Sequence, residues 1–356
     1  MKFLLCSDLH LSTSDKDYAL SVLHEIVALC GKEDCGALLF AGDVFDSWKE
    51  TEALRTDFSG SLEALPRGCA VYYLPGNHEE LYAPVGGALK NFDFGRAKLL
   101  SEKPWSLVQF SAEAELLAIP FQKEYSGYRE WGVPPRNKPL RILLAHGTVP
   151  GIAYTGPRED DDSVLDEGLF AHFDAKLAAL GHLHGHSVTG KGQTLIAYPG
   201  SARVWREGEL GPRKALIGTT EISPLTLEPR TLHSAGEYRV MPVYASPNGK
   251  LEYREPEGLS RPDFLLLEVS GVVEDESSVT QELEKLKTSL EERCRKLTIQ
   301  KKLSVLAGVS DHPLARNFLR GWDEARGRYA DKELAAYELA RLKGLEVLKE
   351  ILESRR

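Results

Sequence analysis

The sequence predicts an α/β fold in which a β-sheet is covered by helices. Short apolar runs recur along the first two thirds of the chain, each run ends in polar residues, and an amphipathic helical stretch separates the first two runs. Continuous apolar runs are typical of strands that are buried on both faces. Strands that alternate with helices are typical of layered α/β domains.

Length and composition exclude several classes of protein. The chain has 356 residues, of which 42% are hydrophobic and 27% are charged, so it can bury a sizeable core. Fibrous, collagen-like and disordered proteins are therefore excluded. Lys and Arg total 44 and Asp and Glu total 53, which gives a net charge of −9 at pH 7. This balance does not favour a general nucleic-acid coat, although it leaves room for a local basic groove.

Five apolar runs are the expected strands of the main domain, and they lie at residues 3–7, 37–41, 70–75, 141–145 and 177–180. Between the first two, residues 17–31 carry apolar side chains at helical spacing and end at a glycine, which predicts a helix. Further strands are expected at residues 115–120, 194–199 and 214–221. Ligands of such sheets collect in the loops beyond the carboxyl ends of the strands.

The composition changes after about residue 225, where Pro, Ser and Gly become frequent. We expect a main domain at residues 1–230, a linker at 231–261, a small α+β cap at 262–310 and a helical segment at 311–356. Within the cap, residues 262–273 predict a strand, 278–299 an amphipathic helix and 301–309 a second strand. The apolar stripe of the last helical segment either packs on its own domain or binds a partner.

The N-terminus and the cysteines predict a cytoplasmic protein without a membrane span. The apolar run at the start is too short to cross a bilayer, and no small-residue cleavage site follows it. The five cysteines are scattered and odd in number, which fits a reducing compartment better than a disulfide framework.

Five polar motifs follow the apolar runs and predict a binuclear metal site. They are Asp8-Leu9-His10, Gly42-Asp43-Val44-Phe45-Asp46, Gly76-Asn77-His78-Glu79, His146-Gly147 and Gly181-His182-Leu183-His184. Each motif alone is more often a turn or a structural histidine. Together, Asp, His and Asn side chains are the ligands that borderline divalent metals prefer. Four other histidines lie outside the motifs and are expected to be structural, while the role of His186 stays open.

This ordered series resembles the calcineurin-like metallophosphoesterases, whose fold is a two-sheet β-sandwich flanked by helices. Residues 198–209 and the C-terminal α+β segment resemble more specifically the SbcD-type DNA-repair nucleases. The resemblance implies that Asp8, His10 and His184 bind one metal ion, that Asn77, His146 and His182 bind the other, and that Asp43 bridges the two. It also implies that His78 is the catalytic histidine and manganese the active metal, although the ligand types also suit iron or zinc.

Three further residues receive expected roles. Asp46 is expected to orient His78 or the site waters. Arg203 and Arg206 follow the last motif closely and are candidates for contact with a substrate phosphate, the alternative being surface ion pairs. Glu79 replaces the aspartate that is usual in the family, and we assign it no catalytic role.

The leading functional hypothesis is a metal-dependent phosphodiesterase that acts on DNA, an exonuclease or endonuclease of the SbcD type. That resemblance also implies a homodimer and an SMC-like ATPase of the SbcC type as a partner. A local cluster of basic residues at positions 293–302 either contacts DNA phosphates or is a solvated helix end. The alternatives are a small-molecule or cyclic-nucleotide phosphodiesterase or phosphatase, and a scaffold whose metal site is only structural.

Overall fold

The computed structural model describes residues 1–81, 83–85, 87–152, 163–220, 225–246, 249–273, 275–305, 309, 312–325 and 331–353. The chain forms two compact units, residues 1–238 and 239–356, and each is described by itself. No helix in these ranges is long and apolar enough to cross a membrane.

The first sheet of unit 1 has six strands in the order β13-β12-β1-β2-β3-β4. The strands are β1 (Lys2–Cys6), β2 (Ala37–Ala41), β3 (Ala70–Leu74), β4 (Ala97–Leu99), β12 (Lys214–Thr219) and β13 (Leu227–Thr231). Strands β1 to β4 are parallel, whereas β12 and β13 each run antiparallel to a neighbour. The carboxyl ends of β1, β2 and β3 therefore meet at one edge of the sheet.

The second sheet has the order β5-β6-β7-β8-β10-β9. Its strands are β5 (Ser106–Gln109), β6 (Ala114–Ile119), β7 (Leu140–His146), β8 (Leu177–Gly181), β9 (Ser187–Lys191) and β10 (Thr194–Tyr198). The four central strands are parallel, and β5 and β9 pair antiparallel at the two ends. The sequence predicted most of these strands, because their central members are buried on both faces and read as unbroken apolar runs.

One apolar layer joins the two sheets into a sandwich. Its buried members alternate along the strands of both sheets and include Phe3, Leu5, Leu39 and Leu74 from the first sheet and Leu116, Ile142, Leu144 and Leu177 from the second. This alternation is the expected pattern for strands that send every second side chain to the same face. The two-sheet sandwich flanked by helices is thus confirmed.

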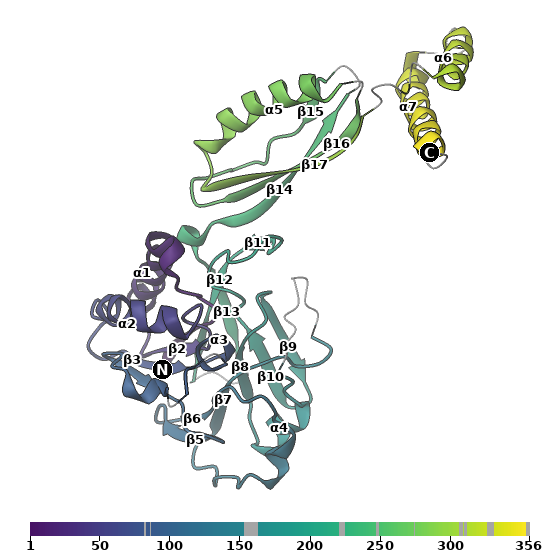
Figure 1. The fold of residues 1–356 in the computed structure, drawn as a ribbon. Coiled ribbons are helices and arrows are strands. Elements are labelled where there is room, and N and C mark those ends of the chain that lie inside the picture. The colour runs from purple at the N-terminus through teal and green to yellow at the C-terminus, as the bar shows by residue number, and fades with distance from the viewer. Residues whose placement is uncertain are drawn as a thin grey trace. The chain divides into compact units, whose positions relative to one another are not determined.

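Helices cover the outer faces of the sandwich (Figure 1). On the first sheet, α2 (Trp48–Leu62) packs Phe58 against Phe40 of β2, with ring centroids 5.4 Å apart. The predicted helix at 17–31 is α1 (Lys16–Lys32), which buries residues of one stripe such as Val22, Leu23 and Ile26. On the second sheet, α4 (Glu167–His172) contributes Leu169 and Phe170 to a separate apolar cluster.

Unit 2 is a small α+β structure. Its strands are β14 (Glu237–Ala245), β15 (Leu251–Tyr253), β16 (Phe264–Val273) and β17 (Lys296–Val305), and its first helix is α5 (Glu276–Glu291). Strands β16 and β17 are parallel and are connected through α5, whose buried Val279, Leu283, Leu286 and Leu290 pack on the sheet. The predicted helix extended to residue 299, but Leu297 and Ile299 lie in β17.

The expected linker at 231–261 is instead largely folded. Strand β14 begins at Glu237, its first residues pair with β11 (Gly211–Pro212), and the unit boundary falls after Tyr238 rather than at residue 230. Every second residue from Met241 to Ala245 is buried, while Pro242 is exposed. The sequence did not reveal this strand, because an alternation of buried and exposed residues is a weak signal over so few positions and the neighbouring residues are rich in Pro, Ser and Gly.

The chain ends in two helices, α6 (Pro313–Ala325) and α7 (Asp331–Glu353). Ala315, Leu342 and Leu345 pack with Val272 of β16 in a small cluster, so part of the apolar stripe is covered by its own unit. Leu339 and Val347 of α7 are exposed. Residues 311, 326–330 and 354–356 of the expected helical segment lie outside the described residues.

Candidate metal centre

The polar motifs follow the carboxyl ends of parallel strands in both sheets. Seven predicted ligands lie there, with Asp8 and His10 after β1, Asp43 after β2, Asn77 after β3, His146 at the end of β7, and His182 and His184 after β8. The loops that follow β1 in the first sheet and β8 in the second sheet meet, so His10 and His184, 174 positions apart in the sequence, lie side by side.

Backbone hydrogen bonds fix these loops to one another. The Asp8 amide donates to the Gly42 carbonyl at 3.0 Å, and the His10 amide donates to the Asp43 carbonyl at 2.9 Å. The amide of His182, which belongs to the other sheet, donates to both carboxylate oxygens of Asp8 at 3.0 and 3.1 Å. The Asp8 carboxylate therefore joins the two halves of the sandwich at the site.

Four of the predicted ligands have left-handed backbone conformations. The φ angles are +52° at Asp8, +46° at His10, +51° at Asp43 and +98° at His182. Each such residue is less stable than in a right-handed conformation by roughly 1 kcal/mol or more. Gly42 has a φ of +96°, and a Cβ there would lie 2.1 Å from Nδ1 of His146. Strain of this kind is concentrated at functional sites, where it aims side chains that a regular strand would direct elsewhere.

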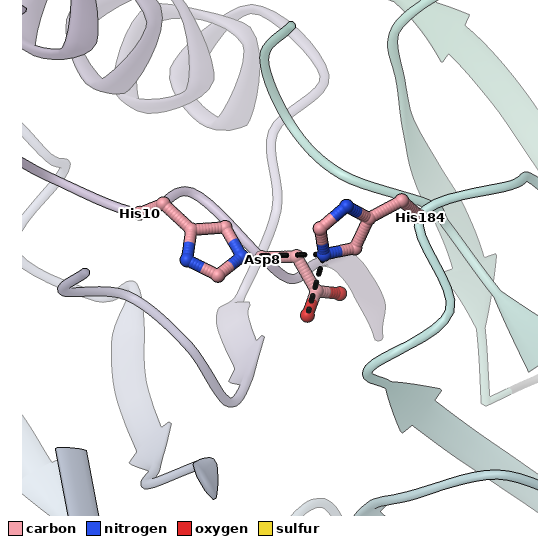
Figure 2. Close-up of side chains that lie close together, drawn as sticks. All are labelled: Asp8, His10 and His184. Atoms are coloured by element: carbon pink, nitrogen blue, oxygen red, sulfur yellow. Dashed lines mark hydrogen bonds and ion pairs between the residues drawn. The ribbon is translucent and has the colours of Figure 1, made fainter. Parts of the chain in front are cut away.

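Asp8, His10 and His184 form the first group of side chains that could hold a metal ion. Figure 2 shows the three side chains pointing toward one another, with the two Nε2 atoms 3.3 Å apart and His184 Nε2 4.0 Å from Asp8 Oδ1. All three residues are buried. Nδ1 of His184 donates to the Glu209 carboxylate at 2.5 Å, which leaves the lone pair of Nε2 facing the group.

The first group fits a cation. Burial and the neighbouring His78 hold the pKa of His10 well below its usual value, so His10 is neutral and can act as a ligand. Nδ1 of His10 and Oδ1 of Asp46 lie 3.4 Å apart, and both are buried without a hydrogen-bond partner. A cation held by the two Nε2 atoms would place the proton of His10 on Nδ1, where it would face Asp46.

Asp43, His146 and His182 form the second group, and Asn77 lies beside it. His146 Nδ1 donates to the Ala41 carbonyl at 2.8 Å, so its Nε2 faces Asn77 Oδ1 at 2.8 Å and Asp43 Oδ2 at 3.3 Å. Burial lowers the pKa of His146, but the charge and hydrogen bond of Asp43, the charge of Asp8 and the Ala41 carbonyl together outweigh burial and raise the pKa to about 9. Nε2 of His146, Asn77 Oδ1 and Asp43 Oδ2 therefore lie close together. A positive charge among these three atoms is favourable, and either a proton on Nε2 or a metal ion can supply it.

The Asp43 carboxylate, the predicted bridging ligand, lies between His146 and the backbone of His78. Its Oδ2 faces His146, and its Oδ1 accepts a 3.0 Å hydrogen bond from the His78 amide. Burial raises the pKa of Asp43, but the charge and hydrogen bond of His146 and the charges of His78 and His10 together hold it well below its usual value. A Cβ on Gly76 would lie 2.1 Å from Asp43 Oδ1, so only glycine leaves room for this carboxylate.

His78 lies beside both groups. Its Nδ1 donates to the Asp46 carbonyl at 2.8 Å, because a carbonyl can only accept, and its Nε2 lies 4.0 Å from Asp43 Oδ2. The His78 side chain is 18% exposed, whereas the His10 side chain is fully buried. Nε2 of His78 is thus the atom that can exchange a proton with a molecule entering the site.

The two arginines differ in their surroundings. Arg203 is buried, and its guanidinium donates to the Leu9 carbonyl at 2.7 Å, to Asp15 at 2.5 Å and to the His10 carbonyl. These bonds favour a structural role over contact with a substrate. Arg206 is partly exposed and stacks on the Trp205 indole, with its guanidinium carbon 4.1 Å from the ring centroid.

Three residues at the site were not assigned roles from the sequence. Glu209 binds His184, and the Trp205 indole stacks on the His10 ring at 3.9 Å between centroids. Buried Glu79 accepts from the Gly76 and Phe45 amides and from the Tyr73 hydroxyl, and burial, together with the charge of Asp43, raises its pKa to about 7. Trp205 and Glu209 carry no periodic signal in the sequence, because both lie in a loop. The only sequence signal for them is that both belong to the motif at residues 198–209.

Three histidines outside the five motifs, His186, His24 and His172, belong to none of the candidate metal groups among the described residues. His186 Nδ1 donates to the Tyr198 carbonyl at 3.2 Å. His24 and His172 are hydrogen-bonded to Ser61 and to the Trp131 carbonyl, respectively.

Two adjacent groups of buried carboxylate and imidazole ligands at the edge of an α/β sandwich define a metal-binding protein. Residues 1–186 match the family model of the calcineurin-like phosphoesterases, and the chain belongs to this family of metal-dependent hydrolases with dimetal centres. No curated protein sequence matches the chain.

Several solved structures are similar to the chain at low sequence identity. The protein TT1561 of Thermus thermophilus is 14% identical, with a TM-score of 0.41, over 65% of this chain and 98% of that one. GAP50, the anchor in the inner membrane complex of Plasmodium, is 10% identical, with a TM-score of 0.41, over 84% and 96%. A dimetal phosphatase from Danio rerio is 9% identical, with a TM-score of 0.40, over 65% and 96%.

Proposed function

We propose that this protein is a DNA nuclease of the SbcD type that hydrolyses phosphodiester bonds with two divalent ions, which are manganese in the active enzyme. The observation that carries the proposal is the presence of two ligand groups, Asp8-His10-His184 and Asp43-His146-His182, with a histidine, His78, beside Asp43. A purely structural metal site has no need of such a histidine. The C-terminal α+β unit and the motif at 198–209 support the nuclease assignment by their resemblance to that family.

The ligands divide between two ions in this proposal. Asp8, His10 and His184 hold one ion, and Asn77, His146 and His182 hold the other, with Asp43 shared by both. When bound, the two cations lower the pKa of a water molecule and neutralise charge on the phosphoryl oxygens.

The protein residues supply orientation and a proton. The Asp46 carbonyl holds the proton of His78 on Nδ1, which directs Nε2 toward the site. When protonated, Nε2 of His78 donates a proton to the leaving oxygen of the substrate. Arg206, held by its stacking on Trp205, contacts a phosphate of the substrate in this proposal.

Partners and location follow from the same resemblance. We propose a cytoplasmic homodimer whose C-terminal helices bind an ATPase of the SbcC type. The exposed apolar side chains of α7 and the five buried free cysteines support this proposal.

A second candidate is a phosphodiesterase or phosphatase that acts on small molecules. The net charge of −9 favours it, and so do ion pairs within the basic cluster at 293–302. Arg293 pairs with Glu255 at 2.7 Å, Lys301 with Glu276 at 3.4 Å and Lys302 with Glu268 at 3.8 Å. These acidic neighbours reduce the positive charge that the cluster could offer to DNA.

The deciding experiment assays manganese-loaded protein on linear duplex DNA and on bis(p-nitrophenyl) phosphate. Cleavage of DNA that falls by about 10²–10⁴-fold in His78→Ala, with metal content retained, is the expected result. Turnover of the small ester without DNA cleavage would favour the second candidate. Inactivity on both substrates with two ions bound would favour a scaffold. His24→Ala, on the exposed part of α1, is the matched control and should be as active as wild type.

A further inference from the structure

Two side chains of the segment between β10 and β12 contact the first ligand group. Trp205 stacks on His10, and Glu209 binds His184, both of which belong to the first group.

The contact of Glu209 with His184 is buried and short. Glu209 is 3% exposed, and its Oε1 accepts from His184 Nδ1 at 2.5 Å. A carboxylate that accepts from Nδ1 fixes the tautomer of the imidazole and directs the Nε2 lone pair into the first group.

Glu209 is itself held in place by its own loop. Its Oε2 accepts from the Trp205 amide at 3.1 Å and from the Ser201 hydroxyl at 3.3 Å, and it lies 3.5 Å from Nη1 of Arg213. The Arg213 guanidinium also donates to the carbonyls of Glu209 and Leu210 at 2.9 and 2.8 Å. The carboxylate therefore has little freedom to turn away from His184.

Trp205 restrains the other imidazole. Its indole lies nearly parallel to the His10 ring, with an interplanar angle of 6°, and meets the rings of His78 and His184 edge-on at 5.2 and 5.3 Å. Stacking on a wide flat ring limits rotation of the His10 imidazole about its Cβ–Cγ bond. Two ligands of one ion are thus held from the same loop.

We infer that Glu209 and Trp205 are positioning residues that set the affinity of the ion bound by Asp8, His10 and His184, and not that of the ion bound by Asn77, His146 and His182. This inference rests on the proposed dimetal function. Loss of a residue that orients a metal-binding histidine typically weakens metal affinity by about 10–100-fold. The two binding steps of the protein should therefore respond differently to changes in this loop.

The test is a calorimetric titration of the metal-free full chain with Mn²⁺. Wild type should bind two ions. Glu209→Gln and Trp205→Ala should each weaken one binding constant by about 10–100-fold and leave the other within about twofold. Trp205→Phe, which keeps a flat ring on His10, should restore most of the affinity. Glu207→Gln, an exposed glutamate of the same loop, is the control and should match wild type.

The possible results distinguish a failure of this inference from a failure of the proposed function. If both constants are unchanged in Glu209→Gln and Trp205→Ala, or if both fall equally, the inference is wrong even if the enzyme is active. If wild type binds fewer than two ions, the proposed dimetal function itself is wrong. Should Glu209→Gln fail to fold by circular dichroism, the Trp205→Ala and Trp205→Phe pair gives the same decision, because phenylalanine rescue is not expected from a merely structural defect.

Discussion

At the scale of single residues, the position of the Asp43 carboxylate depends on the absence of a side chain at Gly76 as well as on the chemistry of the ligands. The Asp43 carboxylate occupies the place where a side chain of residue 76 would be, and its Oδ1 accepts from the His78 amide. The Glu79 carboxylate accepts hydrogen bonds from the backbone amides of Gly76 and Phe45. Small changes of volume next to Asp43 should therefore affect metal binding before they affect the fold.

We predict that Gly76→Ala reduces metal binding severely. A Cβ 2.1 Å from Asp43 Oδ1 must displace that carboxylate or the loop that carries it, and Asp43 is the proposed shared ligand. Metal content after gel filtration, measured by plasma mass spectrometry, should fall below one ion per chain. Gly60→Ala in α2 is the control, because its Cβ meets no atom within 4 Å, and alanine should stabilise the helix by about 0.5–1 kcal/mol. Full metal content in Gly76→Ala would show that Asp43 is not a shared ligand.

At the scale of secondary-structure elements, each unit has a core of its own. The second unit packs α5 against strands β14, β16 and β17 through a cluster that contains no residue of the first unit. Leu290 is fully buried in this cluster, close to the end of the helix. The first unit, by contrast, takes all the predicted ligands from the loops of its own sandwich.

We predict that Leu290→Ala lowers the free energy of unfolding of the second unit by about 2–5 kcal/mol, because it leaves a cavity in that core. Hydrolysis of bis(p-nitrophenyl) phosphate by the first unit should be unchanged at 25 °C. Thermal unfolding followed by circular dichroism, together with the activity assay, checks both statements. Thr288→Ala, an exposed position of the same helix, is the control. A parallel loss of activity in Leu290→Ala would mean that the metal centre depends on the second core.

At the scale of the whole molecule, the site concentrates buried titratable groups, and one of them, Asp8, has an unfavourable charged form without a cation. Asp8 and Asp43 are buried together with four histidines of the two groups. Burial is the main reason that the pKa of Asp8 is raised, so its charged form is unfavourable in the metal-free protein. Bound cations would offset this desolvation, and metal binding would then be coupled to the stability of the first unit.

We predict that removal of metal with a chelator lowers the melting temperature of the protein, and that Mn²⁺ restores it. A ligand that binds only the folded state stabilises it by about 2.7 kcal/mol when its free concentration is 100 times its dissociation constant. Differential scanning fluorimetry over a series of Mn²⁺ concentrations is the measurement. Asp43→Asn should lose most of this dependence, whereas His78→Ala should keep it. An equal response of the two variants would contradict the distinct roles proposed for these residues.

The sequence by itself determined the strand framework and the candidate ligands. Buried strands read as apolar runs because both of their faces are covered, and ligand types with short spacings, such as Asp8 and His10, are legible in one dimension. Only the tertiary structure decided how Trp205, Glu209 and Arg203 act, and that residues 231–261 contribute strands β14 and β15 rather than a linker. Their roles depend on contacts across more than twenty residues of sequence, and such contacts leave no periodic pattern in the chain.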